Sequence, residues 1–247
     1  MSSAQLILLT LLFFATSVIG VITGSNSLIT VPVMFQFGID EKVAVATNMF
    51  GLTFMAIGGT IPFLRQGRID AAKLSPMIVL TAVGSALGAL LVGLITNQGI
   101  KLVVLIAMIV VTAFTLFSPN TEGVRTRTST LIAYPLVFLL AIYGGLYSGG
   151  YVTILTAVLV AFSGMTFTES IASTKLLNVF SSGIATLVFM WQGLIDYRLG
   201  IILGIAMFAV AYVGAHYATK MNEVWLRRIF VTTVILLAVK TIVDFFG

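Results

Sequence analysis

The chain has 247 residues, of which 59% are hydrophobic and only 9% charged, with a mean hydropathy of +1.14. A soluble domain carries about 25% charged residues, so this composition excludes a water-soluble globule and indicates an all-α polytopic membrane protein. The net charge of +5 is spread over the loops without a basic patch, which argues against nucleic-acid binding. With no Cys and one His, we expect no disulfide and no metal site.

Eight hydrophobic blocks follow one another, each about long enough to cross a hydrocarbon core of roughly 30 Å. The first block has no basic stretch before it and no small-residue cleavage site after it, so we expect a first span and not a removable signal peptide. A polar loop at 119–129 connects a first membrane repeat, 1–118, to a second, 130–247. The blocks run roughly over 4–37, 43–64, 74–96, 100–118, 130–163, 166–192, 198–219 and 225–246.

The first block of each half is too long for one straight span, because a helix over either range would measure about 50 Å. Small polar residues interrupt both blocks: TGSNS at 23–27 and YSGG at 147–150. We therefore predict a helix, a break and a shorter helix in each; a steeply tilted helix with a Gly hinge is the alternative. Backbone freed at such a break cannot face lipid, so it lines protein or a water-filled cavity.

An offset of 126 residues relates the two halves. It aligns QGRID at 66–70 with QGLID at 192–196, and Gly38 with Gly164. We predict two repeats of four segments, and that the Asp ending each QGxID turn caps the next helix. Duplicated membrane halves are typical of secondary transporters, whose site lies between the repeats; whether these repeats are parallel or inverted stays open. Counting Lys and Arg over eight crossings places the 119–129 loop and both termini in the cytoplasm.

Lys175 lies inside the sixth block. A helix starting near Thr166 places it about 14 Å along the axis, near the midplane, where a charge costs about 3 kcal/mol or more. Such a cation faces a water-filled path or a partner, and it favours an anion; the alternative is that it pairs with an internal acid and joins helices. At 100° per residue, one arc of about 140° holds Lys175 with Thr174, Asn178, Ser181, Ser182 and Thr186.

The other candidate substrate-binding residues come from the matching helix and the breaks. The position that matches Lys175 is Met49, beside Thr47 and Asn48; Asn48 either donates to a substrate oxygen or hydrogen-bonds between helices. A helix that starts at a break presents N–H groups, hydroxyls and a positive dipole end to an anion; close packing of small residues is the alternative. The break residues are Gly24, Ser25, Asn26, Ser27, Ser148, Gly149 and Gly150.

His216, in the seventh block, is the candidate for proton coupling, since imidazole gains and loses protons near neutral pH. The alternative is that it forms a hydrogen bond between helices.

The doubled order of Gly-rich break, short apolar stretch, Ala/Thr-rich helix and QGxID turn resembles the sulfite exporter TauE/SafE family. The pattern reads GVITGSNSLITVPVMFQFGIDEKVAVATN at 20–48 and YGGLYSGGYVTILTAVLVAFSGMTFTESIASTKLLN at 143–178. The resemblance implies a bacterial-type permease of about eight helices that moves sulfite, sulfonates or related small organic anions. Two departures leave the substrate open: Ser25, Asn26 and Ser27 interrupt the first break, and Pro32 has no counterpart in the second half.

We therefore expect a secondary transporter of a small oxyanion, such as sulfite or an organosulfonate, in the cell membrane, working by alternating access between two repeats. No ATP-binding G-x-x-x-x-G-K-[ST] loop occurs, so an ion gradient, with H+ as the candidate coupling ion, or the anion's own gradient drives transport. We expect no enzyme activity, cofactor or metal. A passive anion channel and an intramembrane structural or assembly protein are the alternatives, while transport direction and oligomeric state stay open.

Overall fold

The structure is a computed structural model that describes residues 3–23, 26–117 and 130–217, together with positions 232, 235, 239 and 243. All regular secondary structure in this part of the chain is α-helical. Five of its helices are long and apolar enough to cross a bilayer, which agrees with an all-α polytopic membrane protein. These five are α3 (Glu41–Arg65), α4 (Ala71–Leu94), α5 (Asn97–Phe117), α8 (Phe167–Trp191) and α9 (Tyr197–Tyr217). The connecting loop 119–129 and, apart from the four single positions, the eighth block lie outside the described residues.

The first block of each half is divided into two helices, as expected. In the first half, α1 (Ser3–Thr23) is followed by α2 (Ser27–Gln36); in the second, α6 (Thr130–Leu146) is followed by α7 (Tyr151–Phe162). Gly150, which caps α7, has a φ of +80°, a conformation that glycine adopts without a Cβ clash. The alternative of one tilted, continuous helix is therefore wrong for both blocks.

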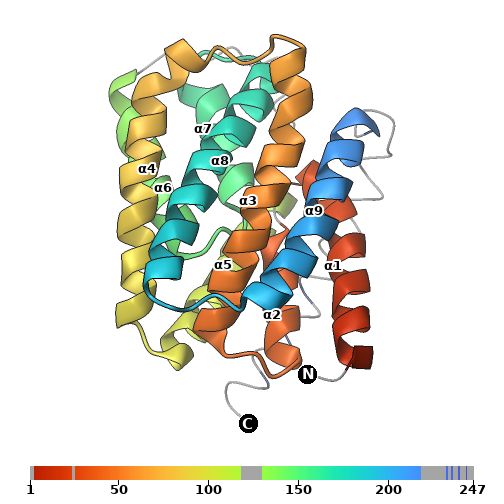
Figure 1. Cartoon of the computed structure of the whole chain (residues 1–247). Helices are drawn as coiled ribbons and strands as arrows, with labels where there is room; N and C mark the ends of the chain where they lie inside the picture. Colours follow the sequence, from red (N-terminus) through yellow and green to blue (C-terminus); the bar gives the residue numbers. More distant parts are fainter. Residues whose placement is uncertain are drawn as a thin grey trace.

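The pair α6–α7 enters the bundle and returns on the same side. α6 runs parallel to α4 and ends near its middle, where Gly145 lies against the backbone of Ser85. α7 then runs back toward the start of α4. Its Leu155 and Leu159 pack in one cluster with Leu74 in the first turn of α4. The second break therefore lies deep inside the bundle (Figure 1).

The pair α1–α2 forms a similar hairpin from the opposite end. The start of α1 lies at the end of the bundle where α2 runs into α3, whereas α6 starts at the end where α3 runs into α4 (Figure 1). The two broken blocks therefore turn back inside the bundle, an outcome that the sequence left open, and the eight crossings assumed for charge counting do not hold. The expectation that the N-terminus shares a side with the start of α6 is wrong, since α1 and α6 start at opposite ends (Figure 1).

Two central helices, α3 and α8, run antiparallel and hold the fold together, with α4 and α6 on one side and α9 and α1 on the other (Figure 1). Thr53 of α3 bonds to Thr186 of α8, their hydroxyl oxygens 3.1 Å apart. The flanking helices approach through glycines: a methyl group on Gly58 would lie 2.9 Å from the carbonyl oxygen of Phe208. Such small residues allow helix backbones to pack closely in membranes.

The QGxID turns fold as predicted. The carboxylate of Asp70 accepts a hydrogen bond from the backbone N–H of Lys73 at 3.0 Å, and that of Asp196 accepts one from Leu199 at 3.0 Å. These bonds satisfy N–H groups that have no partner within the helix. In addition, α3 and α8 begin 126 residues apart and each contains 25 residues.

Candidate functional site

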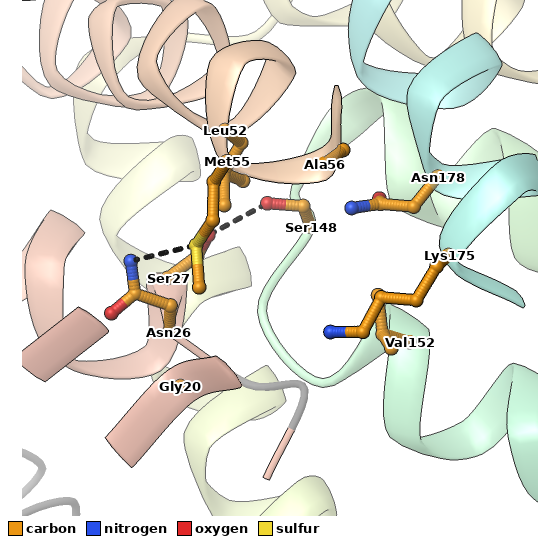
Figure 2. Close-up of a pocket in the computed structure, with 10 residues that line it drawn as sticks. All are labelled: Gly20, Asn26, Ser27, Leu52, Met55, Ala56, Ser148, Val152, Lys175 and Asn178. Carbon is orange, nitrogen blue, oxygen red and sulfur yellow. Dashed lines mark hydrogen bonds between the residues drawn. The ribbon is translucent and has the colours of Figure 1, made fainter. Parts of the chain in front are cut away.

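A cavity of about 30 Å³ lies where the two breaks meet α3 and α8. That is room for one or two water molecules. Figure 2 shows its wall, which combines polar groups of the breaks and α8 with apolar side chains of α3 and α7. The wall consists of Gly20, Asn26, Ser27, Leu52, Met55, Ala56, Ser148, Val152, Lys175 and Asn178.

Lys175 supplies the charge of this wall. The middle of its side chain passes α3 at Gly59, where a methyl group would lie 3.8 Å from its Cδ, and its ammonium group points into the cavity (Figure 2). Asn178, one turn further along α8, points its amide toward the cavity beside Ser148. The ten wall residues include no carboxylate. The cavity is therefore a cationic pocket with neutral hydrogen-bonding groups around it.

The two breaks touch each other at this cavity. The hydroxyls of Ser27 and Ser148 bond across it with their oxygens 2.7 Å apart (Figure 2). The hydroxyl of Tyr147 also donates to the backbone carbonyl of Ser27 at 2.8 Å. Residues more than a hundred positions apart in the chain are thus joined at the cavity into which the ammonium group points.

Both short helices begin at the cavity. Ser27 opens α2, and Val152 lies in the first turn of α7; both belong to the wall. The first N–H groups of a helix have no partner within it and carry the positive end of its dipole. The cavity therefore adjoins two positive helix ends as well as the ammonium group of Lys175.

Asn48 lies behind Ser27, outside the wall. Its Nδ2 donates to the Ser27 hydroxyl at 2.8 Å, and its Oδ1 accepts a hydrogen bond from Thr30 at 2.6 Å. Of the two alternatives for Asn48, this geometry shows the bond between helices. The residue fixes the first turn of α2, including one of the two hydroxyls that bridge the breaks.

Thr47 and Thr174 are fully buried but are not part of the wall. The hydroxyl of Thr47 accepts a hydrogen bond from the backbone N–H of Asp196 at 3.0 Å. Thr174 accepts one from Thr156 at 3.2 Å. Both hydroxyls join helices in this structure.

The second break contributes Ser148 to the wall but not its two glycines. The carbonyl of Gly149 accepts a hydrogen bond from the hydroxyl of Tyr143, and Gly150 packs against Val111 of α5. Three further candidates fall on residues that the structure does not describe: Gly24, Ser25 and the side chain of His216. The backbone of His216 belongs to α9.

The apolar half of the wall was not predicted. Leu52, Met55 and Ala56 come from the middle of α3, and Val152 comes from α7. In so apolar a sequence these residues carry no signal that separates a cavity wall from a packed core. The sulfur of Met55 lies 3.8 Å from the amide nitrogen of Asn26, so polar and apolar groups of the wall are in contact.

The described residues contain no group of three or more His, Cys, Asp or Glu side chains that could hold a metal ion. The chemistry of the cavity is that of one ammonium group with hydroxyl and amide groups. Groups of this kind can hold a small anion by charge and hydrogen bonds.

Comparison with known proteins identifies the family of this chain. The model of the sulfite exporter TauE/SafE family matches residues 8–241. The chain belongs to the sulfite exporter TauE/SafE family. It is 27% identical over 243 residues to a probable membrane transporter protein, ORF9, of Sinorhizobium sp, a match that covers 96% of this chain and 93% of that protein. It is 24% identical over 248 residues to the probable membrane transporter protein YfcA of Escherichia coli, covering 98% of this chain and 92% of that protein.

TauE/SafE proteins form a family of membrane transporters and not a class of enzymes. Membership therefore agrees with the composition and the apolar helices: this chain is a multi-pass membrane protein of a transporter family. No solved structure matches the chain.

Proposed function

We propose that this TauE/SafE protein carries a small oxyanion, such as sulfite or an organosulfonate, across the cell membrane through the cavity at Lys175. The observation that carries the proposal is the ammonium group of Lys175 directed into a wall with no carboxylate. Two unit charges 4 Å apart attract by about 4 kcal/mol at an effective dielectric constant of about 20. Asn178 and the hydroxyls of Ser27 and Ser148 line the same cavity, and all three can donate to the anion's oxygens once the bond between the two hydroxyls opens.

We further propose that residues 1–118 and 130–247 are inverted repeats that alternate access to this cavity. Three observations support inversion: the 126-residue spacing of α3 and α8, their antiparallel course, and two hairpins that enter from opposite ends. A break-containing site between inverted repeats is typical of secondary transporters. The cavity has room for one or two waters, so an anion such as sulfite, with four heavy atoms, requires the breaks to separate.

The test is anion flux in proteoliposomes that contain the purified protein, with sulfite, sulfate, thiosulfate, taurine and sulfoacetate offered separately. Lys175→Met keeps the length of the side chain and removes its charge. Losing an attraction of about 4 kcal/mol predicts a fall in transport efficiency of about a thousandfold. Lys73→Met, on the exposed start of α4, is the matched control and keeps its flux. Unchanged flux in Lys175→Met would remove the cavity from the transport path.

The same vesicles separate a transporter from a passive channel. Alternating access predicts flux that saturates with anion concentration, and H+ coupling predicts that an imposed pH gradient drives anion accumulation. Flux that follows the membrane potential without saturation would support a channel.

A further inference from the structure

A second group of buried polar side chains lies outside the cavity, where α4, α7 and α8 meet. It consists of four hydroxyls: Thr81 and Ser85 of α4, Tyr151 of α7 and Ser181 of α8. Each of these residues is at most 1% exposed, and none belongs to the cavity wall. Buried hydroxyls in apolar surroundings are expected to be hydrogen-bonded.

Two of the four hydroxyls form a chain that ends on the backbone. Ser85 donates to the carbonyl of Ala141 at 3.1 Å, and its oxygen lies 2.7 Å from that of Ser181. Since a serine hydroxyl has one proton, and Ser85 gives its proton to Ala141, Ser181 is the donor in the second bond. The oxygen of Ser181 therefore keeps lone pairs that can accept a further hydrogen bond.

The other two hydroxyls have no hydrogen-bond partner among the described residues. They belong to Thr81 and Tyr151. The Tyr151 hydroxyl lies near those of Thr81 and Ser181, but it is not placed to form a well-aligned hydrogen bond with either. Two unsatisfied donors and an open acceptor thus face the same small region, and leaving buried polar groups unpaired is unfavourable.

We propose that this cluster is a binding site for one water molecule, which bridges Thr81, Tyr151 and Ser181. A buried water typically forms about three hydrogen bonds to polar groups that are otherwise unsatisfied, and three hydroxyls are available here. Water suits this set better than a metal cation, because the cluster has no carboxylate and two of its hydroxyls lack an acceptor for their protons.

The bound water fastens the second break. Tyr151 is the first residue of α7, and its ring lies against Gly144 near the end of α6, where a methyl group would approach it to 2.8 Å. Its neighbour Val152 lines the anion cavity. The water therefore ties the start of α7 to α4 of the first half and α8 of the second.

Thermal unfolding of the purified protein tests this site, because the proposal predicts whether Tm falls or rises when one of the hydroxyls is removed. Tyr151→Phe and Thr81→Val each remove one hydroxyl and nearly keep the shape of the side chain. If water bridges the hydroxyls, each change lowers Tm by about 2–4 °C, the effect of losing about one net hydrogen bond in a chain of this size. The double variant then loses less than the sum, since both changes break the same bridge.

If no water is bound, removing an unsatisfied buried hydroxyl raises Tm, and either single variant that is more stable than the natural protein overturns the proposal. Tyr134→Phe, on the partly buried start of α6, is the matched control and leaves Tm unchanged. A Tm that rises with Na⁺ but not with choline, and loses this dependence in Tyr151→Phe, would show a cation site instead. A direct hydrogen bond between Tyr151 and Thr81 would also make the Tm changes of the two variants non-additive. An experimental density map separates the two cases: the proposal requires a water peak within hydrogen-bond distance of both hydroxyls. A map that shows a direct bond overturns the proposal.

Discussion

The bridge between Ser27 and Ser148 joins the two breaks, so covalent closure of this bridge tests whether they must separate. The natural sequence contains no Cys, and a Ser27→Cys/Ser148→Cys variant therefore holds a single pair of thiols. The two hydroxyl oxygens are 2.7 Å apart, whereas a disulfide has an S–S length of about 2.05 Å. The γ atoms need to approach by about 0.7 Å, which small side-chain movements supply.

The size of the effect follows from the two kinds of bond. The natural bridge is a hydrogen bond worth about 1 kcal/mol net, which opens readily at room temperature. A disulfide does not open without a reductant. If an anion enters only when the breaks separate, every cross-linked molecule is inactive, and the remaining flux equals the share of molecules that are not cross-linked.

Flux in proteoliposomes is measured after mild oxidation and again after dithiothreitol, with the cross-linked fraction determined on the same samples by thiol labelling. Reduction is expected to restore the flux. Each single Cys variant, treated identically, is the control for oxidation itself. A fully cross-linked double variant that transports as fast as the single variants would refute the reasoning, because the anion would then pass without opening the bridge.

Two further changes separate packing from substrate binding. Gly88→Ala places a methyl group 1.9 Å from a backbone carbonyl oxygen of α6. It therefore forces α4 and α6 apart and lowers Tm in a thermal scan by several degrees or prevents folding. Gly183→Ala is the tolerated control, because its methyl group meets nothing closer than 3.9 Å. Thr47→Val removes the hydroxyl that accepts a hydrogen bond from the backbone N–H of Asp196. We expect the free energy of unfolding to fall by about 1 kcal/mol while the KM of transport stays unchanged. A raised KM with unchanged stability would instead show that Thr47 contacts the anion.

Features with a local cause could be predicted from the sequence. The breaks follow from blocks too long for one span and from clusters of Gly and Ser, and the caps follow from an Asp placed directly before an apolar helix. Lys175 was found because a charge inside an apolar helix is costly and needs a reason. The structure directs this side chain into the central cavity with Asn178, which helical spacing alone had placed on the same face.

Features that depend on contacts between distant segments could not be predicted. Whether α2 and α7 continue across the bundle or turn back depends on their packing against α3 and α4. The partners of Asn48 and Thr47 likewise lie on distant segments. The sequence left Asn48 open between a substrate and a bond between helices and made Thr47 a candidate for the substrate, whereas here both bond to protein. Charge counting wrongly placed the N-terminus on the same side as the start of α6, because it assumed that every hydrophobic block crosses.

The unequal charge of the two halves fits a single anion site between inverted repeats. Under the proposed inversion, the counterpart of Lys175 is Met49, which is only 1% exposed and lies in the core. A second ammonium at that position would add another buried charge to a bundle of low dielectric constant, where like charges repel strongly. The protein would then hold two buried cations, each costing about 3 kcal/mol or more at this depth. In the proposed cycle, one cation on α8 stays with the anion while the flanking hairpins open in turn. A single cation would therefore lower the cost of the protein without anion and still supply the proposed attraction for the substrate.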